Sequence, residues 1–152
     1  MKILLAVDGS EFSQAAMKAL VSQMRPESAE VLVLRVVESR IFPVSPQMAP
    51  GYAPEQDEIL KEDFRHAQES VNRASQALRS AGFSVSTRVV EAEARNGIID
   101  IAAEWRADLI VLGSHGRKGL QRFLLGSVAE FVARHADCSV EIVRVPRKHE
   151  TA

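Results

Sequence analysis

The chain has 152 residues, close to the commonest length of one domain, and can bury an adequate core without disulfide bonds. Its 19 basic and 20 acidic residues are intermixed and give a net charge of −1, without the basic stripe that nucleic-acid binding usually requires. The composition therefore argues against a nucleic-acid partner.

The beginning of the chain indicates neither secretion nor a membrane partner. The apolar run from Ile3 to Val7 is too short for a signal-peptide core or a membrane span. Cys138 is the only cysteine, so no internal disulfide can form, which suits a reducing compartment. We therefore expect a cytoplasmic protein.

Short apolar runs bounded by turn residues alternate along the chain with amphipathic helical patterns. In chain order they predict strand 3–7, helix 12–24, strand 31–37, helix 59–81, strand 84–90, helix 98–105, strand 109–112, helix 128–135 and strand 140–145. The run 84–90 is weaker and alternates, as an edge strand does. Strands that alternate with helices predict β-α-β crossovers, and hence one α/β domain over residues 1–146 with a mainly parallel sheet and a tail at 147–152.

Residues 38–56 interrupt this alternation. Four of the six prolines fall in this segment, and proline disfavours both helix interiors and central strands. We expect a long flexible loop, which is either a lid beside a ligand or a plain connector.

Small residues gather between the last two predicted strands, at Gly113, Gly116, Gly126 and Ser127. Glycine can adopt positive φ and lets the backbone approach a ligand closely. A strand end, a glycine turn and a helix start together can cradle phosphate through main-chain N–H groups. Two alternatives stay open: Gly113 could simply turn the chain, and Ser127-x-x-Glu130 also fits a capping box.

The spacing Gly113-x2-Gly116-x9-Gly126-Ser127 resembles the nucleotide-binding signature of the ATP-binding branch of the universal stress proteins. The opening from Ile3 to Ser10 resembles the first strand and turn of that family. Cys138-Ser139-Val140 is similar to its usual Cys-Pro-Val step, with serine in place of proline. The likeness extends from Lys2 to about Val145.

This resemblance implies an open five-stranded parallel sheet of order 3-2-1-4-5, Rossmann-like, with helices on both faces. It implies a crevice between strands 1 and 4 that binds ATP, or AMP or ADP, with Mg²⁺ arriving on the phosphates. Asp8 would approach the ribose or the metal-bound phosphates, although Asp8-x-x-Glu11 also fits a capping box. The main chain of Val36 would recognise adenine. The implied site comprises Ala6, Val7, Asp8, Val36, Leu112, Gly113, Ser114, His115, Gly116, Arg117, Gly126, Ser127 and Val128.

The resemblance implies a stress-response regulator that signals through nucleotide occupancy. The sequence has no Walker-type lysine and no evident residue to orient an attacking water, so we expect no catalytic residues. A slow ATP hydrolase that acts as a timer and an AMP-binding sensor of energy charge remain alternatives.

The last predicted strand, 140–145, is apolar, and an open apolar edge favours pairing with a second chain. The resemblance implies a homodimer in which this strand pairs antiparallel with its twin. The alternative is that the tail beginning at Arg147 covers the edge.

Overall fold

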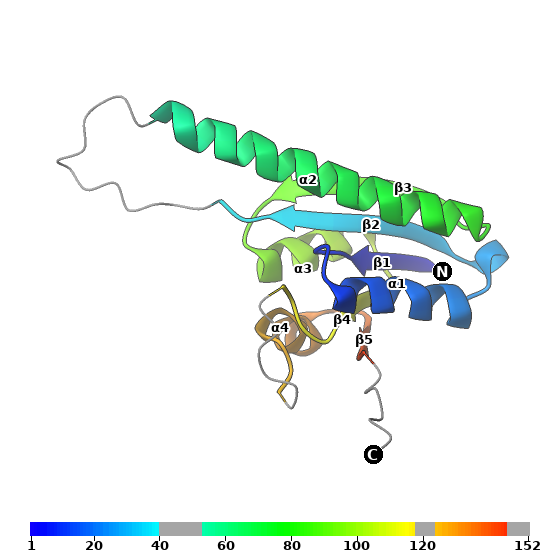
Figure 1. Cartoon of the computed structure of the whole chain (residues 1–152). Coiled ribbons are helices and arrows are strands. Elements are labelled where there is room, and N and C mark those ends of the chain that lie inside the picture. The colour runs from blue at the N-terminus through cyan, green and yellow to red at the C-terminus, as the bar shows by residue number, and fades with distance from the viewer. Residues whose placement is uncertain (40–52, 118–123, 146–152) are drawn as a thin grey trace, which may run out of the picture.

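Five parallel strands form the centre of the computed structural model, which describes residues 1–39, 53–117 and 124–145 (Figure 1). The strands are Lys2–Ala6 (β1), Glu30–Val37 (β2), Ser84–Glu91 (β3), Leu109–Gly113 (β4) and Ser139–Val143 (β5). They lie in the order β3-β2-β1-β4-β5, and every neighbouring pair is parallel. The predicted Rossmann-like fold class and strand order are confirmed, as is the edge position of β3.

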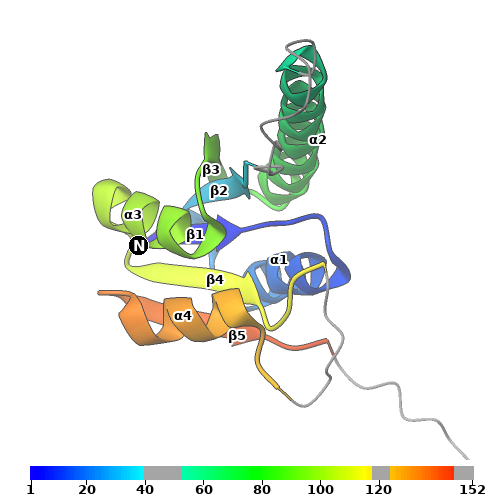
Figure 2. The ribbon, with the colours of Figure 1, turned by 90° about the vertical axis from the view of Figure 1, so that its left-hand side faces the viewer.

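Helices cover both faces of the sheet (Figure 2). They are Glu11–Gln23 (α1), Ala53–Ser80 (α2), Ala94–Trp105 (α3) and Ser127–His135 (α4), with a short 3-10 turn at Pro26–Ser28. Helices α1 and α2 lie on one face, and α3 and α4 lie on the other. This arrangement follows from right-handed crossovers that run in opposite directions on the two sides of β1.

Three element boundaries differ by two residues or more from those predicted, and the others agree to within one residue. Helix α2 begins at Ala53, so residues 53–56 of the expected loop are helical. Pro54 is tolerated there because the first helical N–H groups have no intrahelical partner. The residues 40–52 and the tail 147–152 lie outside the described residues, so the expected lid or connector does too. Strand β5 ends at Val143, two residues before the predicted end.

Helix α3 begins at Ala94, four residues before its predicted start at Ile98. Its N-cap residue, Glu93, makes no side-chain capping bond. Instead, the Ala94 N–H donates to Oε1 of Glu38 at 2.8 Å, from the end of β2. A cap supplied by a residue 56 positions away leaves no local sequence signal, which explains the error.

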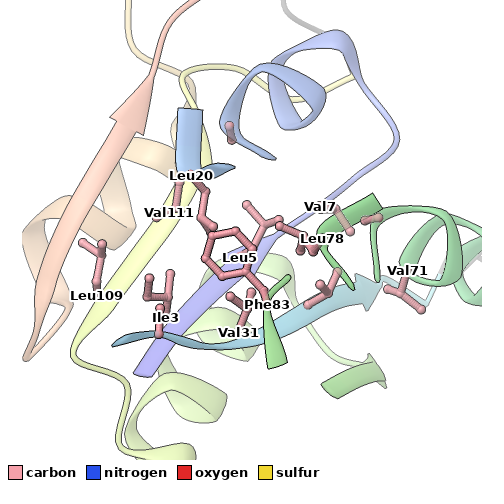
Figure 3. Close-up of a cluster of buried hydrophobic side chains, with 14 residues drawn as sticks. Ile3, Leu5, Val7, Leu20, Val31, Val71, Leu78, Phe83, Leu109 and Val111 are labelled. Atoms are coloured by element: carbon pink, nitrogen blue, oxygen red, sulfur yellow. The ribbon is translucent and has the colours of Figure 1, made fainter. Parts of the chain in front are cut away.

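Two apolar clusters, one on each face, fix the central strands. Ile3, Leu4 and Leu5 of β1 are fully buried, with Leu4 on the α3–α4 face and its neighbours on the α1–α2 face. Figure 3 shows the cluster on the α1–α2 face, in which Leu5 lies beside Leu20 of α1 and Leu78 of α2. Each fully buried side chain of this size contributes about 1.5–3 kcal/mol. The carboxyl ends of β1, β2 and β4 are therefore held on a rigid base.

Candidate nucleotide-binding site

A cavity of about 1110 Å³ opens at the carboxyl ends of β1, β2 and β4, where the strand order reverses direction. Open parallel sheets bind ligands at this switch point. The cavity brings together almost all of the predicted site residues, which come from four separate segments of the chain. They are Ala6, Val7, Asp8, Val36, Leu112, Gly113, His115, Gly116, Arg117, Gly126, Ser127 and Val128.

Ser114 is the predicted residue that does not line the cavity. It is 1% exposed, and its N–H donates to the carbonyl of Val143 in β5 at 2.8 Å. Its carbonyl accepts from the N–H of Gly126 at 2.8 Å. Ser114 therefore ties the turn after β4 to the next strand and to the start of α4.

The main chain of Val36 faces the cavity because β1 ends before β2 does. Among the described residues, the β1–β2 ladder ends with the Val7 N–H donating to the Leu34 carbonyl at 2.9 Å, whereas β2 stays paired to β3 through Val37. The N–H and C=O of one residue in a parallel strand point to the same side, and residues two apart share that side. Val36 therefore presents one donor and one acceptor toward the crevice, as Leu34 does toward β1.

The N-terminus of α4 forms the opposite wall. Its N-cap residue is Gly126, which makes no side-chain capping bond, and Ser127, Val128 and Ala129 of the first turn line the cavity. The alternative that Ser127 caps this helix is wrong, because Ser127 is already its first helical residue. Uncapped first-turn N–H groups and the positive end of the helix dipole together make an anion site.

Two glycines of the motif, Gly113 and Gly126, are needed for packing. A Cβ on Gly113 would lie 2.6 Å from Cβ of Phe12, and one on Gly126 would lie 2.9 Å from the Ser114 carbonyl oxygen. The motif glycines do not use the positive φ that is open to glycine, because among the described residues positive-φ glycines occur only at Gly9 and Gly82. The turn that needs the left-handed region follows β1, where Gly9 has φ +80°.

Asp8 organises the turn after β1. Its Oδ1 accepts from the Ser10 N–H at 2.9 Å, and the Ser10 hydroxyl in turn accepts from the Ser13 N–H at 3.2 Å. The alternative that Asp8 caps α1 is wrong, because Ser10 is the N-cap residue. The other carboxylate oxygen of Asp8 faces Gly116, where an added Cβ would lie 3.3 Å away. Asp8 therefore retains an oxygen on the cavity side.

His115 braces the turn through both ring nitrogens. Nδ1 lies 2.9 Å from the hydroxyl of Ser114, and Nε2 bonds to the carbonyl of Leu124. A carbonyl can only accept, so Nε2 carries a proton. The ring also lies 5.1 Å from that of Phe12. These contacts give His115 a structural part in holding the two ends of the segment between β4 and α4.

The cavity also includes residues that sequence reasoning missed. Arg35 comes from β2, Glu38 directly follows it, and Ala94 and Ile98 come from α3. Asp63 and His66 come from the N-terminal half of α2, which extends past the ends of the strands in Figure 1. The one available signal was Arg35, a lone charge inside an apolar strand. No helix of the described part of the chain is long and apolar enough to cross a membrane.

The doubly wound parallel sheet defines a Rossmann-like α/β protein, and the cavity at its switch point is a candidate ligand site. The model of the universal stress protein family matches residues 1–144. The chain belongs to this family.

Individual relatives agree. Universal stress protein MJ0531 of Methanocaldococcus jannaschii is 36% identical over 97% of this chain and 84% of its own length. The structure of universal stress protein UspA from Lactobacillus plantarum is 27% identical, with a TM-score of 0.82 over 95% of this chain and 97% of that one. The universal stress protein from Archaeoglobus fulgidus, solved in complex with dAMP, is 24% identical with a TM-score of 0.66, over 94% of this chain and 97% of that one. That last likeness shows the fold alone.

Proposed function

We propose that this protein binds ATP in the cavity and acts in the cytoplasm as a regulatory module whose state follows nucleotide occupancy. One observation carries the proposal: the exposed main chain of Val36 and the uncapped N-terminus of α4 open into the same cavity. The main chain of Val36 can hydrogen-bond the edge of a nucleotide base, and the N-terminus of α4 can bind phosphate. The dAMP bound by the Archaeoglobus fulgidus relative supports an adenine nucleotide as the ligand class.

Adenine fits the Val36 edge by hydrogen-bond pattern. Its N1 accepts and its N6 amino group donates, which complements one N–H and one C=O on the same side of a strand. Ala6, Leu112 and Ile98 supply apolar walls for the flat ring. Hypoxanthine reverses both groups at this edge, so the site should discriminate ATP from ITP.

Phosphates belong at the other end of the cavity. The N–H groups of Ser127 and Val128 and the positive end of α4 favour the β- and γ-phosphates. Among the described residues, no group of three or more His, Cys, Asp or Glu side chains could hold a metal ion. We propose that Mg²⁺ is held chiefly by the phosphates and water, as this hard cation commonly is.

The polar groups of the cavity favour binding over hydrolysis. Glu38 accepts from a main-chain N–H group, and both nitrogens of His115 are engaged. Nε2 of His66 lies 3.1 Å from Glu62. Groups committed to the scaffold are poor candidates to activate water, so we propose turnover below about one per second, which is slow for an enzyme. We also propose that two copies associate through β5.

Ser127→Pro tests the phosphate site. Proline is favoured at the first helical position, and Gly126 already has the extended conformation that precedes proline comfortably (φ −61°, ψ 150°). The variant should therefore keep α4 while it loses one N–H donor. A hydrogen bond to a charged group contributes about 1.5–3 kcal/mol, so calorimetry should show ATP binding weakened by roughly 10- to 100-fold.

The matched control is Ser127→Ala, which keeps the N–H, loses the hydroxyl and should retain most of the affinity. Circular dichroism and thermal melts should show that both variants fold. Parental ATP affinity in a folded Ser127→Pro variant, or equal affinities of the parent for ATP and ITP, would contradict the proposed function.

A further inference from the structure

Arg35 is a buried cation without a fixed anion. It lies on β2, it is 8% exposed, and it lines the nucleotide cavity. Its Nη1 is buried and has no hydrogen-bond partner. No ion pair within 4.0 Å joins its guanidinium to a carboxylate of the described residues. Buried charges are normally paired, so this group is an exception that needs a reason.

A second guanidinium lies beside the first. Nη1 of Arg35 and Nη2 of Arg117 lie 3.7 and 3.8 Å from the same point, the position that a Cβ on Gly9 would occupy. Arg117 is held there by its Nε, which donates to the main-chain carbonyl of Asp8 at 2.7 Å. Two cations from different elements, β2 and the turn after β4, therefore lie close to Gly9.

The convergence is unfavourable in the free protein. Burial lowers the pKa of Arg35 most, and the neighbouring Arg117 lowers it further, while Asp8 and Asp63 raise it. Both acids therefore offset the repulsion in part, but neither forms an ion pair with Arg35 within 4.0 Å, and Asp8 directs Oδ1 to the Ser10 N–H. Arg35 is buried and Arg117 is exposed, and an incoming anion would relieve the repulsion between these two like charges.

We propose that Arg35 and Arg117 form a second anion site in the cavity, which recognises a phosphate group of the ligand in addition to the one at α4. This proposal rests on the proposed nucleotide function and extends it to ligand selection. Guanidinium forks pair well with phosphate, and two of them favour a more highly charged ligand. The phosphate is either the end of a 5′ triphosphate chain or a phosphate carried by a ribose hydroxyl beside Asp8.

Arg35→Met separates this role from a structural one. Methionine replaces the buried stem with apolar volume and removes the unpaired charge, so the ligand-free variant should melt at the same temperature as the parent or higher. At the same time, calorimetry should show one preference falling by about tenfold, either for ATP over AMP or for adenosine 3′,5′-bisphosphate over AMP, through the loss of one charge-assisted contact, with adenosine binding unchanged. Binding of inorganic triphosphate should weaken by a similar factor.

Arg88→Met is the matched control, because Arg88 lies on the neighbouring strand β3, pairs with Glu104 and does not line the cavity. Arg35→Lys keeps the charge without the fork and should fall between parent and Arg35→Met. Adenosine 3′,5′-bisphosphate distinguishes the two sources. An Arg35-dependent preference for it over AMP places the second phosphate on the ribose, and an Arg35-dependent preference for ATP places it on the 5′ chain.

Two results would overturn the proposal. One is an Arg35→Met variant with parental affinities for ATP, the bisphosphate and inorganic triphosphate. The other is a lower melting temperature of the ligand-free variant, which would mean that Arg35 is a satisfied part of the scaffold. Either result leaves the proposed ATP site standing if ATP still binds, whereas loss of ATP and adenosine binding by the parent itself would reject the proposed function.

Discussion

The glycines around the cavity differ in which neighbouring atoms their missing side chains leave room for. Gly126 leaves room for the Ser114 carbonyl oxygen, which would lie 2.9 Å from an added Cβ, and for Cα of His115 at 3.1 Å. These neighbours of Gly126 are backbone atoms, which cannot move aside without distorting the turn. Gly116 differs, because the nearest atom to an added Cβ is the side-chain oxygen Oδ2 of Asp8 at 3.3 Å. Its neighbour is a carboxylate that also faces the ligand cavity.

This difference predicts that two alanine variants are impaired in different properties, one in stability and the other in ATP binding. Gly126→Ala should lower the free energy of unfolding by about 1–3 kcal/mol, as overpacking against backbone does. Gly116→Ala should change stability less but weaken ATP binding, because it displaces the carboxylate of Asp8. Denaturant unfolding and calorimetry on the two proteins would check this pair. A Gly126→Ala protein as stable as the parent would contradict this prediction, because it would show that the turn can accommodate the added methyl group.

Among the elements, α3 approaches the end of β2 unusually closely. Gly97, inside the helix, is buried, and an added Cβ would lie 3.2 Å from both methyl groups of Val36 and 3.1 Å from Cβ of Ala92. A glycine inside a helix costs about 1 kcal/mol relative to alanine, so its presence has a packing reason. The close approach holds Val36 in the place from which its main chain faces the cavity.

Gly97→Leu should therefore weaken both folding and ATP binding. We expect the free energy of unfolding to fall by about 1–3 kcal/mol, because the overpacking outweighs the better helix propensity of leucine. Ala103→Leu, on an exposed position of the same helix, is the control and should leave both properties near those of the parent. Chemical unfolding and calorimetry measure the two effects. Parental ATP affinity in Gly97→Leu would separate the position of Val36 from nucleotide binding.

On the scale of the whole molecule, β5 is the edge of the sheet that bears on assembly. It pairs only with β4 among the described strands. The Val143 carbonyl accepts from the Ser114 N–H on the β4 side, so the main chains of Val140 and Ile142, in the alternate positions, face outward. Outward N–H and C=O groups on an apolar edge can pair with a second copy.

Val140→Pro should block this pairing. Proline removes one outward N–H and is tolerated on edge strands, so the β4–β5 ladder should survive. Light scattering at micromolar concentration should give twice the 16.7 kDa mass of the chain for the parent and a shift toward that single mass for the variant. Val140→Ala keeps the N–H and should remain a dimer. A monomeric parent would remove the homodimer from the proposed function.

Local chemistry along the chain was enough to predict the alternation of strands and helices, because apolar runs and amphipathic spacing are read within a few residues. The family signature at Gly113, Gly116 and Gly126 predicted the region around which the cavity forms. Sequence could not show that these glycines admit Phe12 and Ser114, because those contacts come from the packing of α1 and of the turn after β4.

The remaining features depend on partners distant in the chain. The start of α3 depends on Glu38, 56 residues earlier, and Arg35 meets Arg117 only because β2 and β4 flank β1 in the finished sheet. Such pairs leave no periodic pattern, since each residue alone is consistent with a solvated charge. The functional importance of Arg35 and Arg117 can be inferred only after the fold has brought the two charges together at one edge of the sheet.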